Sequence, residues 1–458
     1  MKSNLKIAIL TYHREGRSVL RYLLRHPNLF PGAIITACDA DPKTRVPHGV
    51  QKQVGPTHLS NLGQFDLIFR TPGLSYFRRE FRNARRQGAR FTSLTELFFS
   101  EAPKRINRNH LIAVTGSKGK STTATLIYRF LKAAGKPVFF AGNIGQPALE
   151  ILPRLTRKSW VVLELSSFQL EELRQSPHIA VMCELFPEHL DIHGSRQRYY
   201  QAKSQLVRNQ KKNDLVFYLS RNPDTARVVR LGPGRKIPVG DMSPLFSPAD
   251  LKVRGGHQYR NAVLAATVAE HLGVPAKIIQ RVTRSFPGLP HRLQLVRRAK
   301  PRTVPLGGSH AWAKPRTVLP GRSGAWVDFY DDSASTNPTA TVAALSAFAD
   351  TPHVLLAGGR DKDLNYRPLA QAIRKNRTRA VVLIGQDKEK IARAIRATRV
   401  PIYRSATLSA AVRKAYALAK KFPPRSAVVF SPAALSFDMF RNYQDRGEQF
   451  QKIVSQLG

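Results

Sequence analysis

The stretch AVTGSKGKSTTA, residues Ala113 to Ala124, decides the fold of the middle of this chain. Before the glycines the apolar run LIAVT predicts a β-strand, and after them the run STTATLIYRFLKAAG predicts a helix. The inner face of that helix carries four apolar side chains, Leu126, Ile127, Phe130 and Leu131. A turn from strand to helix presents backbone N–H groups and the positive end of the helix dipole, and both bind phosphate. The sequence therefore predicts an α/β domain with a nucleotide site at this turn.

The turn departs from the strict phosphate-loop pattern, which requires a glycine where this chain has Val114. Gly116 and Gly119 still allow the tight curve, Lys120 can reach terminal phosphates, and the Ser121 hydroxyl can bind Mg²⁺. An ordinary glycine-rich turn is the simpler alternative. Strand, loop, Lys-Ser pair and helix in this order favour a variant of the phosphate loop.

Polar side chains follow the next predicted strands. The run VVLELSSFQLE places Glu164 where a strand ends, and a carboxylate at the carboxyl edge of a parallel sheet is suited to binding Mg²⁺. Its flanking residues are apolar, so a buried charge there needs a partner such as a cation. His189 and Asp191 follow another strand end, and Lys203 lies on the helix beyond. A surface Glu and a structural His are the simpler alternatives, but convergence on one loop favours a site.

The 458 residues exceed a single core, and short apolar runs alternate with amphipathic helices throughout. We expect three α/β domains with largely parallel sheets, over residues 1–104, 105–290 and 291–458. The first begins with the strand KIAIL, a helix over residues 17–25 and the strand AIITACD, and RFTSL is another strand-like run. In the third, KPRTV occurs twice within a basic, Gly- and Pro-rich stretch at 300–324, which predicts a hairpin loop or insertion of no assigned function.

The charge is extreme, with 74 Lys and Arg against 30 Asp and Glu and a formal net charge of +44. Such a surface attracts polyanions, including nucleic acid. The basic residues are scattered, without a tail or an aromatic-interleaved tract, so we expect nucleic acid to bind only non-specifically.

Two distant cysteines, Cys38 and Cys183, indicate a reducing compartment and neither a disulfide scaffold nor a zinc site. No run is long enough for a signal peptide or a membrane span. We expect a cytoplasmic monomer.

Five stretches together resemble the Mur ligase family, in order and over nearly the whole chain: AVTGSKGKST, GNIGQPAL, VLELSSFQLE, EHLDIHGSRQRYYQAKSQL and GLPHRLQ. The loop of this family lacks the first glycine, which accounts for Val114. The C-terminal SPAALSFDMFRNYQDRGEQF is similar to members that add glutamate to UDP-N-acetylmuramoyl-L-alanine. The resemblance implies an N-terminal Rossmann-like domain that binds UDP, a central P-loop ATPase domain with a mostly parallel sheet, and a C-terminal Rossmann-like domain. It also implies an ATP-dependent, ADP-forming ligase acting on these small-molecule substrates in peptidoglycan precursor synthesis.

The resemblance also implies roles for individual residues. Lys120, His189 and Lys203 would be catalytic, and two Mg²⁺ ions would be held, one by Ser121 and Glu164, the other by His189 and a Lys203 carboxylated by carbon dioxide. The expected ATP contacts are Thr115, Gly116, Ser117, Lys118, Gly119, Lys120, Ser121, Thr122, Gln258, Asn261, Arg292 and Asp332. The uridine diphosphate would lie near Gly16, Ser18, Asp39, Thr71, Pro72 and Gly73, and the muramoyl-alanine portion near Asn143, Ser166, Gln169 and His189. Glutamate would meet Thr336, Lys362, Ser436, Phe437 and Tyr443.

Three departures from the family pattern leave alternatives open. The first turn, TYHREGRS, keeps only Gly16 and Ser18 of a glycine-rich turn, so His13, Arg14 and Arg17 could donate to the diphosphate instead, or form only a basic loop. Lys118 stands for the usual asparagine and could change the position of the γ-phosphate. Ala334 stands for a lysine typical of D-glutamate-adding enzymes, which leaves an L-glutamate-adding branch open, although D-glutamate is favoured.

Three broader alternatives remain: another amide synthetase of this family, a degenerate paralogue, and a basic, nucleotide-regulated nucleic-acid-binding protein.

Overall fold

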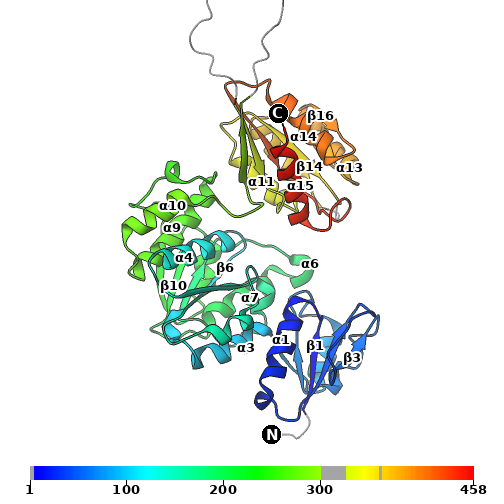
Figure 1. Ribbon diagram of the computed structural model, residues 1–458, viewed down its shortest axis with the longest axis vertical. Helices are drawn as coiled ribbons and strands as arrows, with labels where there is room; N and C mark the ends of the chain where they lie inside the picture. Colours follow the sequence, from blue (N-terminus) through cyan, green and yellow to red (C-terminus); the bar gives the residue numbers. More distant parts are fainter. Residues whose placement is uncertain (1–4, 301–325, 361–363, 458) are drawn as a thin grey trace, which may run out of the picture. The chain divides into compact units, whose positions relative to one another are not determined.

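A computed structural model describes residues 5–300, 326–360 and 364–457. These residues form three β-sheets that follow one another along the chain, with helices between the strands (Figure 1). The expected α/β class with mostly parallel sheets is confirmed. By contacts the described residues form two compact units: the first ends at Ser247 but also includes Arg260–Arg284, and the second comprises Pro248–Tyr259 and the chain from Ser285 onward.

The first sheet is entirely parallel, with strand order β3-β2-β1-β4-β5. Its strands are β1 (Lys6–Leu10), β2 (Ile34–Asp39), β3 (Gln51–Val54), β4 (Leu67–Phe69) and β5 (Arg90–Thr92). Its helices are α1 (Arg14–Arg25), α2 (Arg79–Arg86) and α3 (Leu94–Glu101). The expected run RFTSL is strand only to Thr92, because the Ser93 side chain accepts from the Glu96 amide and begins α3.

Helix α1 corrects the predicted start at residue 17. It begins at Arg14, so Arg14 and Arg17 lie on a helix and not in a loop. Gly16 is buried, and a Cβ there would lie 2.5 Å from the Thr11 carbonyl oxygen. A side chain at residue 16 would therefore prevent the close packing of α1 on the turn after β1.

The second sheet, also parallel, has the order β11-β10-β9-β6-β8-β7. Its strands are β6 (Leu111–Thr115), β7 (Val138–Gly142), β8 (Trp160–Glu164), β9 (Ile179–Met182), β10 (Leu215–Leu219) and β11 (Arg235–Val239). The helices are α4 (Lys120–Ala133), α5 (Ser167–Leu170), α6 (Leu190–His193), α7 (Arg196–Arg208), α8 (Pro223–Val229), α9 (Gly256–His271) and α10 (Ala276–Ser285). Successive strands lie on opposite sides of β6, first β7 and β8, then β9. Open α/β sheets bind ligands at such a reversal, at the carboxyl ends of the strands.

The third sheet has the order β12-β13-β17-β14-β15-β16 and is parallel except for the pairing of β12 with β13. Its strands are β12 (Gln294–Ala299), β13 (Trp326–Asp331), β14 (His353–Gly358), β15 (Thr378–Ile384), β16 (Ile402–Arg404) and β17 (Arg425–Phe430). The helices are α11 (Pro338–Ser346), α12 (Arg367–Lys375), α13 (Lys388–Ile395), α14 (Leu408–Ala419) and α15 (Tyr443–Ser455). Most of the predicted 300–324 insertion lies outside the described residues.

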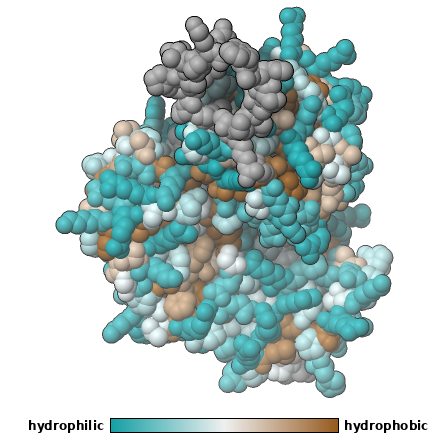
Figure 2. Space-filling model, turned by 45° about the horizontal axis from the view of Figure 1, so that its top comes forward, coloured by the Kyte–Doolittle hydropathy of each residue, from teal (hydrophilic) through white to brown (hydrophobic). Residues whose placement is uncertain are grey.

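Hydrophilic side chains predominate on the face shown in Figure 2, with hydrophobic patches between them. Across the described ranges, no helix combines the length and apolar composition that a membrane span requires.

Candidate functional site

The predicted phosphate loop lies between β6 and α4, in the predicted order of strand, loop and helix. Gly116 has φ +152° and Gly119, the residue before α4, has φ +86°. A Cβ at Gly116 would lie 2.6 Å from the Cys183 Cβ, and one at Gly119 would lie 2.2 Å from the Asn261 Oδ1. Both positions therefore require glycine for backbone conformation and for space.

Replacing Gly119 by alanine should weaken both the fold and nucleotide binding. The left-handed backbone costs about 1–2 kcal/mol for alanine, and the methyl group must also displace Asn261. We expect the free energy of unfolding to fall by about 2 kcal/mol or more in urea denaturation, and ATP affinity to fall in calorimetry. Gly135→Ala is the control, because Gly135 has φ +75° but no atom within 4 Å of a new Cβ. Equal losses in the two variants would contradict a role for the Asn261 contact.

Lys120 is the first residue of α4, and its ammonium lies against the loop. Its Nζ donates to the carbonyl oxygens of Gly116 and Ser117, each at 3.0 Å. The cation therefore lies where loop amides and the helix N-terminus would meet a phosphate.

Lys203, on α7, approaches the loop from the protein interior. Its Nζ donates to the Thr115 Oγ1 at 3.0 Å and to the Gly116 carbonyl at 2.9 Å, and the side chain is 1% exposed. Burial, with Lys120 nearby, lowers the pKa of Lys203 well below its usual value. A buried amine that is easily neutral can act as a nucleophile, which a surface lysine does poorly at neutral pH.

Glu164 ends β8 and pairs in register with Val114, next to the loop. Its carboxylate is fully buried: Oε2 accepts from the Asn143 Nδ2 at 3.1 Å, whereas Oε1 has no hydrogen-bond partner among the described residues. A buried, unpartnered carboxylate oxygen fits a divalent cation. Nowhere in the described ranges do three His, Cys, Asp or Glu side chains gather as a metal site. Additional oxygen ligands, such as the Ser121 hydroxyl, phosphate or a carbamate, would have to complete it.

His189 precedes α6 with a left-handed backbone (φ +56°) and a half-exposed ring. Burial of part of the ring lowers its pKa, and Lys120 and Lys203 are close enough to add to this effect. The structure thus brings Lys120, Glu164, His189 and Lys203 together around one loop.

Sequence reasoning missed Glu188, the residue before His189. The Lys118 Nζ lies 3.0 Å from the Glu188 Oε1, so the cation that replaces the usual asparagine is paired. Burial raises the pKa of Glu188, but Lys118 and Lys120 outweigh this and lower it overall. Lys118 itself could have indicated this acidic partner, because a cation within a phosphate loop suggests a counter-charge nearby.

Ser117 connects the loop to the segment after β9. Its amide donates to the Glu184 carbonyl at 2.8 Å, and its Oγ donates to the Phe186 carbonyl and accepts from the Phe186 amide. Ser121 and Thr122 lie buried in the first turn of α4.

Three residues expected near the muramoyl-alanine portion, Asn143, Ser166 and Gln169, have hydrogen-bond partners within the first unit. Ser166 and Gln169 form a capping box at the start of α5, and the Gln169 Nε2 donates to the Glu15 Oε1 at 2.7 Å. Asn143 contacts Glu164, as described above. Together these side chains lie beside the ends of β7 and β8.

Several residues expected near the uridine diphosphate form hydrogen bonds with backbone groups of nearby turns. Asp39 is buried and accepts from the amides of Tyr12 at 2.6 Å and Asp41 at 2.9 Å. Arg14 donates to the Gly145 carbonyl and Arg17 to the Tyr12 carbonyl, so both guanidinium groups have backbone partners. Ser18 is buried on α1, and Thr71, Pro72 and Gly73 follow β4, where the Thr71 Oγ1 is buried without a partner in the part of the chain described.

In the second unit, Asp332 follows β13 and accepts from the hydroxyls of Ser335 at 2.5 Å and Ser431 at 2.7 Å. Burial raises the pKa of Asp332 to about 6, although nearby Arg292 lowers it. Gln258 is also in this unit, whereas Asn261 belongs to the first. Four predicted glutamate contacts are described: Thr336 after β13, buried Ser436, exposed Phe437, and Tyr443 at the start of α15. Lys362 lies outside the described residues.

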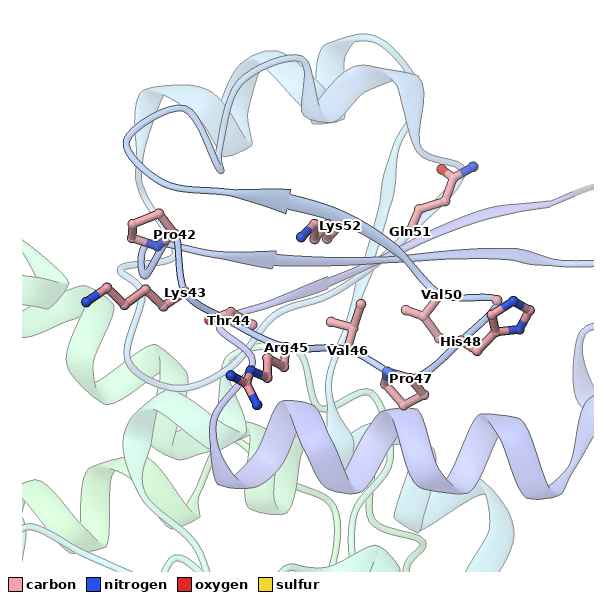
Figure 3. A pocket seen from close by; sticks show the side chains of 11 residues that line it. Pro42, Lys43, Thr44, Arg45, Val46, Pro47, His48, Val50, Gln51 and Lys52 are labelled. Atoms are coloured by element: carbon pink, nitrogen blue, oxygen red, sulfur yellow. The ribbon is translucent and has the colours of Figure 1, made fainter.

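A broad hollow of about 1060 Å³ lies elsewhere, along the 42–52 loop of the first sheet. Its basic side chains do not converge: Lys43 and His48 lie at opposite ends of the loop in Figure 3. A ligand site needs polar groups aimed at a common point, so this hollow is a poor candidate.

Two protein-family models match the chain. The model of the Mur ligase middle domain matches residues 114–244, and the model of the Mur ligase, glutamate ligase domain matches residues 317–434. The chain is 33% identical to a UDP-N-acetylmuramoylalanine--D-glutamate ligase of Acetivibrio thermocellus, over 99% of this chain and 97% of that one. It is 34% identical to the protein of the same name from Solibacter usitatus, over 98% and 97%.

Solved structures share the fold at low identity. They include the Thermotoga maritima MurF ligase in complex with ADP, with a TM-score of 0.57, 16% identity and 99% of each chain covered. The UDP-N-acetylmuramate-alanine ligase MurC of the same organism has a TM-score of 0.54 and 18% identity, again over 99% of each chain.

Proposed function

Because the chain belongs to the Mur ligase family of ATP-dependent, ADP-forming amide ligases, we propose that it adds D-glutamate to UDP-N-acetylmuramoyl-L-alanine. The observation that carries this proposal is the meeting of Lys120, Lys203 and Glu164 at the β6–α4 loop, within a chain similar throughout to glutamate-adding ligases. The activity would serve peptidoglycan precursor synthesis.

The loop residues would hold the triphosphate. Gly116 and Gly119 allow the backbone curve, the N-terminus of α4 supplies N–H donors, and Lys120 would turn from its loop carbonyls to the β- and γ-phosphates. Ser121 and the free oxygen of Glu164 would hold one Mg²⁺, and His189 with a carboxylated Lys203 the second. When bound, these ions neutralise charge on the transferring phosphoryl group.

Lys203 is suited to carboxylation. Its pKa is lowered by burial, so a neutral amine is accessible, and attack on carbon dioxide forms an N–C bond with loss of one proton. The product is an anion in place of a cation. An anion next to the buried Glu164 would need cations between the two groups, in agreement with a metal site there.

The reaction itself needs three anionic reactants in one place. A carboxylate oxygen of the alanyl group would attack the γ-phosphorus and release ADP, giving an acyl phosphate. The glutamate amine would then attack the acyl carbon, and phosphate would leave as the C–O bond breaks and the amine loses a proton. Positioning and charge neutralisation supply most of the catalysis in such transfers. The net charge of +44 favours the approach of all three reactants.

The choice of D-glutamate rests on the names of the relatives. Ala334 shapes its turn through its backbone, since its amide donates to the His291 carbonyl and its carbonyl accepts from the Thr336 amide, each at 3.1 Å. Loss of the usual lysine therefore does not need to disturb this turn.

We expect D-glutamate to support phosphate release with UDP-N-acetylmuramoyl-L-alanine and ATP at least about tenfold better in kcat/KM than L-glutamate, a difference of about 1.4 kcal/mol. A coupled phosphate-release assay with each enantiomer measures this ratio. A preference for L-glutamate would place the chain in the L-glutamate-adding branch. Salt-sensitive binding to duplex DNA without precursor-dependent ADP release would favour a nucleic-acid-binding role instead.

A further inference from the structure

Arg70 follows β4, and its side chain is buried at the carboxyl edge of the first sheet. The Nη2 donates to the Glu172 Oε2 at 2.6 Å and to the Phe168 carbonyl at 2.7 Å, while the Nε also donates to Glu172. The Glu171 Oε2 lies 2.7 Å from the same Nη2. One guanidinium therefore contacts α5 at Phe168 and both residues that follow this helix, Glu171 and Glu172.

The contacts continue from α5 to α6. The Glu171 Oε1 lies 3.1 Å from the His193 Nδ1, and the His193 Nε2 is 3.0 Å from the Ser167 Oγ. The Phe168 ring stacks on His193, with centroids 4.9 Å apart and planes at 4°. A second link from the first sheet comes from Ser75, whose Oγ donates to the Ile192 carbonyl at 3.0 Å.

These two short helices begin at residues of the candidate site. Helix α5 starts directly after Ser166, contains Gln169 and follows Glu164 by three residues, and α6 starts directly after His189. In contrast, the contacts of Lys120 with Gly116 and Ser117 lie within the loop itself. Arg70 therefore contacts the segments that would hold the acceptor substrate, and its hydrogen bonds and ion pairs in the described part of the chain include none with the phosphate loop.

The Arg70 guanidinium is the main counter-charge of a group of buried glutamates. Glu15, Glu171 and Glu172 lie near one another, and Glu15 accepts from Gln169. Burial lowers the pKa of Arg70, but Glu172 and Glu171 outweigh this and raise it, so the guanidinium stays charged. Removing it would leave buried carboxylates without their main counter-charge, and unpaired buried charges are strongly unfavourable.

We propose that Arg70 is a positioning residue that holds α5 and α6, and through them Gln169 and His189, in place for the UDP-muramoyl-alanine substrate. The inference rests on the proposed function for its kinetic consequence, but its structural part can be tested without catalysis.

The kinetic test compares Arg70→Lys and Arg70→Met with Arg78→Met. Arg78 is a matched control because it lies nearby in sequence, is exposed and pairs only weakly with exposed Glu80. We expect KM for the UDP-muramoyl-alanine substrate to rise about tenfold or more and kcat to fall in the Arg70 variants, with KM for ATP within about twofold of wild type. Lysine keeps the charge but loses the forked contacts, so its effect should be the smaller. Parallel rises in KM for all substrates, or no change, would overturn the proposal.

Hydrogen exchange supplies the readout that does not depend on the reaction. In Arg70→Lys, amides of residues 167–172 and 190–194 should exchange faster, while those of α4 and the loop keep wild-type rates. Unchanged exchange, a uniform rise over the whole first unit, or global unfolding of both Arg70 variants would refute a local positioning role. If the wild-type protein releases no precursor-dependent phosphate, the proposed function fails, and the exchange pattern still decides whether Arg70 holds these segments.

Discussion

Replacing Lys203 by alanine should lower precursor-dependent phosphate release on the order of 10³-fold, because it removes a proposed metal ligand from beneath the loop. The side chain also hydrogen-bonds Thr115 and Gly116, so part of the loss would come from a less ordered loop. Kinetic assays at saturating Mg²⁺ and ATP measure the loss. Added bicarbonate should not restore the variant.

Two further measurements separate carboxylation from a plain cationic role. Lys203→Arg keeps a positive charge but cannot form the carbamate, so it should be as inactive as the alanine variant. Wild-type activity should fall as the pH falls, because protonation of the Lys203 amine removes the nucleophile, and bicarbonate should oppose this fall. Lys211→Ala, at an exposed position after α7, is the surface control. An active Lys203→Arg enzyme would refute the carbamate.

Lys120→Ala should reduce phosphate release by a factor on the order of 10³ while leaving the fold intact. Two hydrogen bonds of its ammonium go to the Gly116 and Ser117 carbonyls of its own loop, and the side chain is only partly buried at the start of α4. Thermal unfolding should therefore shift by only a few degrees. Lys132→Ala, in the exposed last turn of the same helix, should retain wild-type activity. Substantial phosphate release by Lys120→Ala would remove the loop lysine from the mechanism.

Local sequence patterns were sufficient for the elements around the loop. The apolar run of β6 and the inward face of α4 follow from residues close together in the chain, and Leu126, Ile127, Phe130 and Leu131 are buried as expected.

The pattern of apolar residues did not predict the start of a helix or strand whose first residues are polar. The apolar side chains of α1 start at Val19, so the hydrophobic pattern does not include its first turn, which contains Arg14 and Glu15. Glu15 suits the positive helix N-terminus, but hydrophobic periodicity contains no such information. The antiparallel edge strand β12 was missed for a similar reason, because its polar sequence QLVRRA lacks a clear apolar run.

The character of the site depends on residues that are far apart in the chain. Sequence spacing placed Glu164 at a strand end, His189 after another strand end and Lys203 on the helix beyond, but the order of strands around β6 brings them to one loop. Burial in the folded chain lowers the pKa of Lys203. The fold also pairs Lys118 with Glu188, 70 positions apart, and Arg70 with Glu172, 102 positions apart. A strand or helix reflects preferences of adjacent residues, whereas desolvation and charge pairing depend on which surfaces the folded chain brings into contact.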